Sequence, residues 1–250
     1  MTKQPFEEPD WLSDPQAVRQ LTSTGELRAA LNFGNPVLAQ RDPATGEPRG
    51  VSADLARGLA QRLGVSVRFK AFETAGKIFE EAQDNTWDVA FMAIDPVRAV
   101  DIRFTDPYVL IEGTYLVQER SSLHHIDDID RSGVRVAVGE GAAYDLFLSR
   151  ALRHASIVRF ETSQDAIEQF AERGLHAAAG VRQPLETYAR EHAGFRVLDG
   201  CFEVIKQAMC CPRGRDAGAQ LLDRYLDFSR SSGLIKEGLR RSGQGDTKTA

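Results

Sequence analysis

The sequence contains little cysteine. Its 250 residues include three cysteines, Cys201, Cys210 and Cys211. An odd number with two adjacent members does not describe a disulfide framework, and no cysteine–histidine set has the spacing of a zinc site. We therefore expect no metal site, and we interpret the cysteines as small buried hydrophobic residues.

Long apolar runs and an excess of positive charge are also missing. No apolar run approaches the ~20 residues that a membrane-spanning helix requires, so we expect no membrane span. The formal net charge is −5, and no basic cluster is long enough to bind a nucleic-acid backbone. The first ten residues show neither an apolar core nor a cleavage site, so they do not predict a signal peptide.

Short apolar runs alternate with amphipathic stretches along the chain. We predict strands at 26–33, 65–69, 89–94, 113–117, 134–138, 157–160, 174–182, 195–198 and 204–211. We predict helices at 15–21, 53–63, 75–84, 141–152, 163–173, 184–192, 221–228 and 234–239. We expect Ser163 to be the N-cap of the helix at 163–173. This order is typical of an α/β protein with a parallel sheet and crossover helices, and 250 residues are enough for two lobes.

The segment 87–108 is the most indicative of function. Residues 89–94 form a short apolar run that predicts a buried strand. Asp95 and Pro96 then favour the start of a helix, because Asp is a preferred N-cap and Pro fits the first helical position. Arg98 falls in that first turn, where a cation is favourable only if an anion shares the site. The alternative is a solvated arginine or a structural ion pair.

The same segment resembles the signature of the bacterial extracellular solute-binding proteins of the amino-acid type, family 3. In that family a strand with Asp leads to a turn with Arg and then to a Phe-Ser-x-Pro-Tyr strand. The matching residues are Asp88, Arg98, Phe104, Thr105, Pro107 and Tyr108. The resemblance implies a two-lobed periplasmic-binding-protein-like (type II) fold, with two parallel-type sheets flanked by helices and joined by a two-strand hinge.

The resemblance extends along most of the chain and implies its division. The first lobe would comprise residues 22–116 and 204–242, and the second lobe residues 117–203. Residues 1–12 and 243–250 would be flexible tails. The two lobes would close on a ligand by a hinge motion.

The resemblance also implies where the ligand binds. Arg98 would hold the ligand's carboxylate through a two-pronged donor geometry that lysine cannot copy. The loop after the first strand would border the ligand, and backbone N–H groups at 141–143 would contribute from the second lobe. The expected ligand-binding residues are Arg98, Ala93, Asp95, Asn35, Glu140, Gly141, Ala142, Ala143 and Arg182.

Three positions depart from the family pattern. Ala93 and Ala142 stand where residues with hydroxyl groups would be expected. Val181 holds the place of the Asp that pairs with the ligand's α-ammonium group, and Arg182 follows it. A desolvated ammonium without a partner would cost several kcal/mol. We therefore expect a small organic acid rather than a plain amino acid.

Two arrangements of that ligand stay open. An acid with two acidic ends would be held by Arg98 at one end and by Arg182 and the turn at 141–143 at the other. Alternatively, Glu140 would pair with an amine, so amino acids are not excluded.

The resemblance implies a binding protein with an ABC importer permease as partner, without a cofactor, and monomeric. It implies a periplasmic location, whereas the missing signal peptide leaves a cytoplasmic location and a sensor role open. The alternative is an enzyme, because some relatives are dehydratases acting on prephenate or arogenate. Its general acid would be Glu140, Asp95 or His176.

Overall fold

A ten-stranded mixed sheet runs through the centre of the molecule. The computed structural model describes residue 12 and residues 14–250. The main order is β4-β1-β5-β11-β6-β9-β7-β8, and β10 and β12 pair with β6. The strands are β1 (Leu27–Asn32), β4 (Val67–Phe72), β5 (Val89–Ala93), β6 (Ile102–Gln118), β7 (Arg135–Gly139), β8 (Ser156–Phe160), β9 (Ala177–Val181), β10 (Phe195–Val197), β11 (Glu203–Pro212) and β12 (Lys248–Thr249). A separate hairpin joins β2 (Gln40–Arg41) and β3 (Pro48–Arg49).

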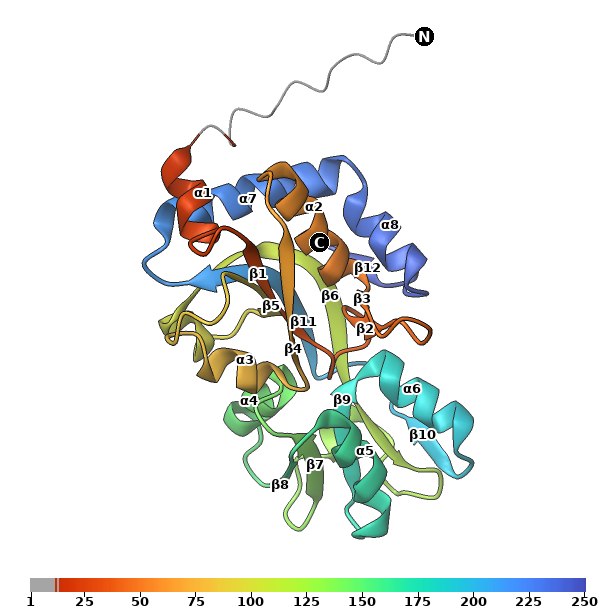
Figure 1. Cartoon of the computed structure of the whole chain (residues 1–250). Helices are drawn as coiled ribbons and strands as arrows, with labels where there is room; N and C mark the ends of the chain where they lie inside the picture. Colours follow the sequence, from red (N-terminus) through yellow and green to blue (C-terminus); the bar gives the residue numbers. More distant parts are fainter. Residues whose placement is uncertain (1–11, 13) are drawn as a thin grey trace.

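The helices gather around two parts of this sheet, which form the two lobes (Figure 1). They are α1 (Pro15–Leu21), α2 (Val51–Arg62), α3 (Ala75–Glu80), α4 (Ala143–Ala151), α5 (Ser163–Glu172), α6 (Arg182–Glu191), α7 (Asp216–Ser231) and α8 (Leu234–Arg241). Figure 1 shows α1, α2, α7 and α8 around the upper lobe, and α5 and α6 around the lower lobe. None of the described helices is long and apolar enough to cross a membrane.

Two strands connect the lobes. The first part of β6 pairs with β11, and Gly113 to Leu116 of β6 pair with β9. The expected two sheets therefore form one continuous hydrogen-bonded sheet, because β6 belongs to both lobes. The lobes lie on either side of this connection, and the boundaries 22–116, 117–203 and 204–242 stay a prediction.

β6 is longer than the predicted strand at 113–117, since it begins at Ile102 and has 17 residues. It contains Pro107, which has no N–H for the ladder. The pairing with β11 shifts its register beside Pro107, between Gln207 and Ala208. This irregularity lets the strand continue past the proline.

The other predicted helices and strands agree with the structure to within about five residues at each end, with three differences. At residues 95–100 the structure forms only a 3-10 turn, Arg98–Val100, because the chain enters β6 at Ile102. Helix α5 is capped by Thr162 rather than Ser163, and Thr162 and Asp165 form a capping box.

The third difference concerns the carboxy-terminal residues. The expected flexible tail at 243–250 instead contains β12, which pairs with Leu110 and Val109 of β6. Backbone hydrogen bonds to the edge of β6 hold this polar segment in a strand, which its composition does not predict. The tail expected at 1–12 lies outside the described residues, apart from residue 12.

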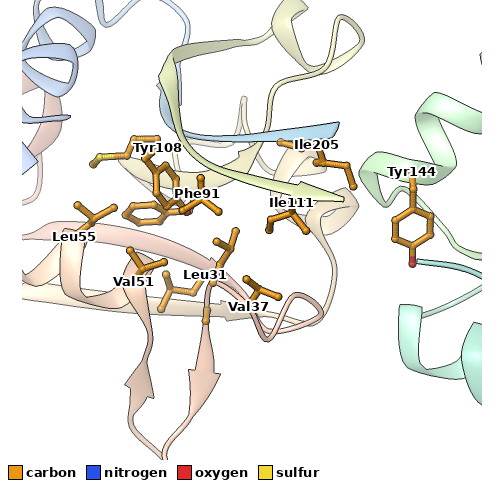
Figure 2. Packing of buried hydrophobic residues seen from close by; sticks show 14 of the residues in the cluster. Leu31, Val37, Val51, Leu55, Phe91, Tyr108, Ile111, Tyr144 and Ile205 are labelled. Carbon is orange, nitrogen blue, oxygen red and sulfur yellow. The ribbon is translucent and has the colours of Figure 1, made fainter. Parts of the chain in front are cut away.

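The buried core of the first lobe packs between the sheet and α2. Figure 2 shows Leu31, Val51 and Leu55 next to Phe91 and Tyr108. The rings of Phe91 and Tyr108 meet edge to face at 6.2 Å, an arrangement that adds about 0.5–1.5 kcal/mol to burial. This packing fixes β5, and β5 leads directly to the turn that carries Arg98.

A buried carboxylate fixes the start of the same strand. Asp88 is 0% exposed and accepts hydrogen bonds from Arg28 Nε at 2.8 Å and Arg215 Nη1 at 2.8 Å. Its two arginine partners come from β1 and from the residue before α7. The Asp of the sequence signature therefore has a structural role, because it ties three segments of the first lobe together.

Candidate functional site

A cavity of about 50 Å³ lies between the lobes. The first lobe contributes the turn after β1, the start of α3 and the end of β5. The second lobe contributes the start of α4, Ser163 and Val181, and β11 adds Ile205 and Gln207. One water molecule needs roughly 10–15 Å³ by this measure, so the cavity has room for only a few water-sized groups.

Arg98 is buried in the wall of this cavity. Its side chain is 1% exposed and donates from Nη1 to the carbonyl oxygen of Ala93, at 3.2 Å, and from Nη2 to that of Gly141, at 2.8 Å. Burial lowers its pKa, and the charge of Asp95 partly opposes that shift. An arginine nevertheless stays charged in proteins. Within the described chain its hydrogen bonds go to carbonyl oxygens and not to a carboxylate, so no carboxylate binds the guanidinium directly.

Asp95 does not line the cavity. Its Oδ1 accepts a hydrogen bond from the N–H of Val97 at 2.8 Å, which stabilises the turn. Its Oδ2 pairs with Nη2 of Arg150 in α4 at 2.7 Å. The structure therefore places Asp95 in a contact between the lobes rather than at the expected ligand position.

The turn at 141–143 meets the first lobe closely. The N–H of Gly141 donates to Asp145 Oδ2 at 3.0 Å, and that of Ala142 to the carbonyl of Gly139 at 3.2 Å. Two of the three backbone donors expected for the ligand are thus already used within the turn. Ala142 and Ala143 do line the cavity.

Gly141 itself contributes a carbonyl to Arg98 and close contact with α3. Its φ is +68°, and a Cβ at this position would lie 3.1 Å from Cα of Gly76. The positive φ therefore favours glycine here, and a side chain would make a tight contact with α3.

Asn35 reaches the cavity from the turn after β1. Its residue is 7% exposed, and its Oδ1 is buried without a hydrogen-bond partner. The turn is fixed by hydrogen bonds from Gly34 N–H to Asn32 Oδ1 at 3.0 Å and from Leu38 N–H to the Asn35 carbonyl at 3.1 Å. A Cβ on Gly34 would collide with the carbonyl of Glu73. The expected loop residue is therefore held firmly at the site.

Arg182 is not part of the cavity wall. Its Nε pairs with Glu112 at 2.6 Å, its Nη1 lies 3.5 Å from Glu186, and its Nη2 donates to the carbonyl of Gly200. These contacts occupy all three nitrogens of the guanidinium, which lies at the surface where α6 begins. The expected second arginine for a two-ended acid is thus not brought to the site. Glu140 and Ala93 do line the cavity.

Several lining residues were not predicted from the sequence: Glu73, Thr74, Tyr144, Ser163 and Gln207. Gln207 is a buried polar residue next to the apolar end of β11, and it pairs with Ala93 of β5. Such a residue in a buried strand is a usable sequence signal. Glu73 and Thr74 lie in the segment before α3, whereas Tyr144 and Ser163 lie in the first turns of α4 and α5.

A second hollow of about 330 Å³ adjoins the cavity and shares several walls with it. Apolar residues including Phe33, Pro36 and Pro184 line it. Between the two spaces the hydroxyl of Tyr144 donates to Ser163 Oγ at 2.7 Å. No group of three His, Cys, Asp or Glu residues in the described chain could hold a metal ion.

Comparison with known proteins identifies relatives over most of the chain. Residues 23–241 match the model of the family of bacterial extracellular solute-binding proteins, family 3. A glutamine-binding protein from Geobacillus stearothermophilus is 21% identical over 189 residues, which cover 74% of this chain and 72% of that protein.

Solved structures share the two-lobed fold. A mutant of ArgBP from T. maritima superposes with a TM-score of 0.77 at 20% identity, and the match covers 90% of this chain and 98% of that one. A solute receptor for L-cysteine of Neisseria gonorrhoeae has a TM-score of 0.79 at 18% identity, and the match covers 90% of this chain and 92% of that one. An ancestral amino acid-binding protein, a precursor of cyclohexadienyl dehydratase, has a TM-score of 0.75 at 23% identity, and the match covers 90% of this chain and 98% of that one.

Proposed function

The chain belongs to family 3 of the bacterial extracellular solute-binding proteins, and on that premise we propose that it captures a small carboxylate-bearing solute between its lobes. The observation that carries this proposal is Arg98, a buried guanidinium on the cavity wall whose hydrogen bonds in the described chain go only to carbonyl oxygens. A carboxylate is the planar anion that fits such a fork of donors.

The energetics of Arg98 favour an anionic guest. A buried charge without a counter-charge is costly, and an arginine cannot relieve that cost by losing its proton. The two carbonyl oxygens supply only partial negative charge. A carboxylate bound beside Arg98 would supply the full charge and could replace one carbonyl as hydrogen-bond acceptor.

Contacts between the lobes support capture by closure. Besides the hydrogen bond from Arg98 to Gly141, Arg150 pairs with Asp95 at 2.7 Å and Lys77 with Glu161 at 3.4 Å. These three contacts are polar and exist only while the lobes are together, so a bound solute would shift the equilibrium towards the closed form.

We further propose that the captured solute is delivered to an ABC importer permease outside the cytoplasm, which is the usual role of this family. Titrating detergent-solubilised candidate permeases with the liganded protein would test this step. Binding of the liganded form by one of them supports import, and failure with the whole set favours a sensor.

The enzymatic alternative needs a general acid at the cavity. Of its three candidates Glu140 lines the cavity, Asp95 is ion-paired with Arg150, and His176 Nδ1 accepts from the backbone N–H of Arg135 at 3.0 Å. We therefore propose binding without turnover, which incubation with prephenate and detection of phenylpyruvate would test.

A thermal-shift screen tests the proposal itself. Mono- and dicarboxylates, the corresponding amides and simple amines would be added to the purified protein. Carboxylates are expected to raise the midpoint of unfolding, because a ligand that binds only the folded state stabilises it. A screen in which amides stabilise as well as their carboxylates would contradict the role of Arg98.

A further inference from the structure

We propose that the group next to the solute's carboxylate is a neutral hydroxyl, accepted by Asn35 Oδ1, so that the site prefers a 2-hydroxycarboxylate to the matching 2-amino acid. This inference rests on the proposed function, because it needs Arg98 to hold the carboxylate. The two residues line the same small cavity from the same lobe.

Asn35 supplies the acceptor. Its Oδ1 is buried without a hydrogen-bond partner, although the residue is only 7% exposed. A buried acceptor left unpaired carries a free-energy cost, and most such atoms in folded proteins are satisfied. The backbone carbonyl of Asn35 accepts from Leu38 and Ala39, so the turn that carries this side chain at the cavity is fixed. A donor on the solute is the partner that this atom lacks.

The cavity offers little for an ammonium group. In the described chain its acidic lining residues are Glu73 and Glu140, and both are exposed. Glu73 moreover pairs with Arg41 at 3.1 Å. The buried wall is formed mainly by apolar residues such as Phe91 and Ile205.

The charge of the wall therefore favours a neutral donor. An ammonium group that leaves water needs a counter-charge close by, whereas a hydroxyl needs only one acceptor. The amide oxygen of Asn35 can accept a hydrogen bond from a hydroxyl, but it carries no charge to balance an ammonium group. The buried cation Arg98 adds repulsion for any further positive charge in the same cavity.

Calorimetry with four matched probes tests the inference on the wild-type protein. L-lactate, L-alanine, pyruvate and propionate differ only in the group beside the carboxylate. The same comparison with 2-hydroxy-4-methylpentanoate, leucine, 4-methyl-2-oxopentanoate and 4-methylpentanoate allows for a tail in the adjoining hollow. We expect the hydroxy acid of at least one set to bind about tenfold more tightly than the other three members.

The outcomes separate this inference from the proposed function. Equal binding of all four members, or tighter binding of the amino acid, overturns the hydroxyl preference and leaves the carboxylate site standing. Failure of every carboxylate in both sets to bind overturns both.

Two variants locate the preference at Asn35. Asn35→Leu is expected to reduce hydroxy-acid affinity to that of the unsubstituted acid, whose affinity serves as the control because it needs only Arg98. Asn35→Asp places a carboxylate at the same point and is expected to shift the preference towards the amino acid by about tenfold. Unchanged discrimination in a folded variant that still binds the unsubstituted acid would overturn the assignment to Asn35.

Discussion

Arg150 in α4 and Asp95 after β5 form an ion pair between the two lobes, with 2.7 Å between Nη2 and Oδ2. Asp95 lies three residues before Arg98, the residue that donates to Gly141 of the second lobe. The turn at 95–100 thus carries both the proposed anchor and a contact that joins the lobes. The proposed solute binding and closure would therefore be coupled through this turn.

We predict that Arg150→Gln favours the open form. The variant should show a larger radius of gyration by small-angle X-ray scattering without solute, and a several-fold weaker affinity for a carboxylate. Because Arg150 is 43% exposed, the free energy of unfolding should change by at most about 1 kcal/mol. Arg153→Gln, on an exposed residue just beyond α4, is the control. Equal radii for the two variants would contradict the coupling.

Asp88 should matter for stability rather than for binding. Replacement with Ala leaves Arg28 and Arg215 without their buried counter-charge, and we expect a loss of about 3–5 kcal/mol in the free energy of unfolding. Urea denaturation measures it. Asp84→Ala, on an exposed residue of the same segment, should change stability by less than about 0.5 kcal/mol. A similar small effect at Asp88 would show that the ion-pair cluster is dispensable.

Gly141 and Gly133 form a matched pair for testing closure. Both have positive φ, so alanine at either should cost about 1 kcal/mol of stability. At Gly141 a Cβ would also lie 3.1 Å from Gly76 Cα, whereas nothing lies within 4 Å at Gly133. We expect Gly141→Ala alone to weaken carboxylate affinity in calorimetry. Equal affinities for the two variants would argue against close approach of the lobes in the bound form.

Glu203 should make stability depend on pH. Burial and the charge of Asp95 raise its pKa to about 7, while Arg150 opposes the shift. Its Oε2 has no hydrogen-bond partner. Because the folded state holds a proton that the unfolded chain releases from about pH 4.5 upward, this group should reduce the free energy of unfolding as pH rises from about 4.5 to 7.

The comparison with Glu203→Gln isolates that contribution. The midpoint temperature of thermal unfolding should fall less steeply with pH in the variant than in the wild type. The variant should also be the more stable protein at pH 8. Parallel curves for the two proteins would show that Glu203 titrates normally.

The sequence was sufficient to predict most helices and strands, because the apolar runs at 89–94 and 134–138 lie in buried strands with few alternatives. It could not predict that 243–250 adds a strand to β6, since backbone pairing at a sheet edge leaves no trace in a polar sequence. Nor could it show that Pro107 lies inside a single long strand, because the register shift that accommodates it depends on β11.

The candidate site was predictable only in part. Arg98 and Asn35 follow strand ends, and strand ends of one sheet meet at one edge, so both reach the cavity. Arg182 has a similar position in the sequence, but a neighbouring strand supplies Glu112 and removes it from the site. Whether an arginine pairs with a carboxylate of its own chain depends on tertiary contacts. A local sequence pattern does not predict these contacts.

The most direct test of the account compares two lysine substitutions by isothermal titration calorimetry, using the carboxylate that stabilises the protein most in the thermal-shift screen. Arg98→Lys keeps the charge and removes the two-pronged donor, so affinity should fall at least about tenfold. Arg182→Lys, at an arginine outside the cavity, should keep its affinity within about twofold. If both variants fold and Arg98→Lys binds as tightly as Arg182→Lys, Arg98 is not the carboxylate anchor.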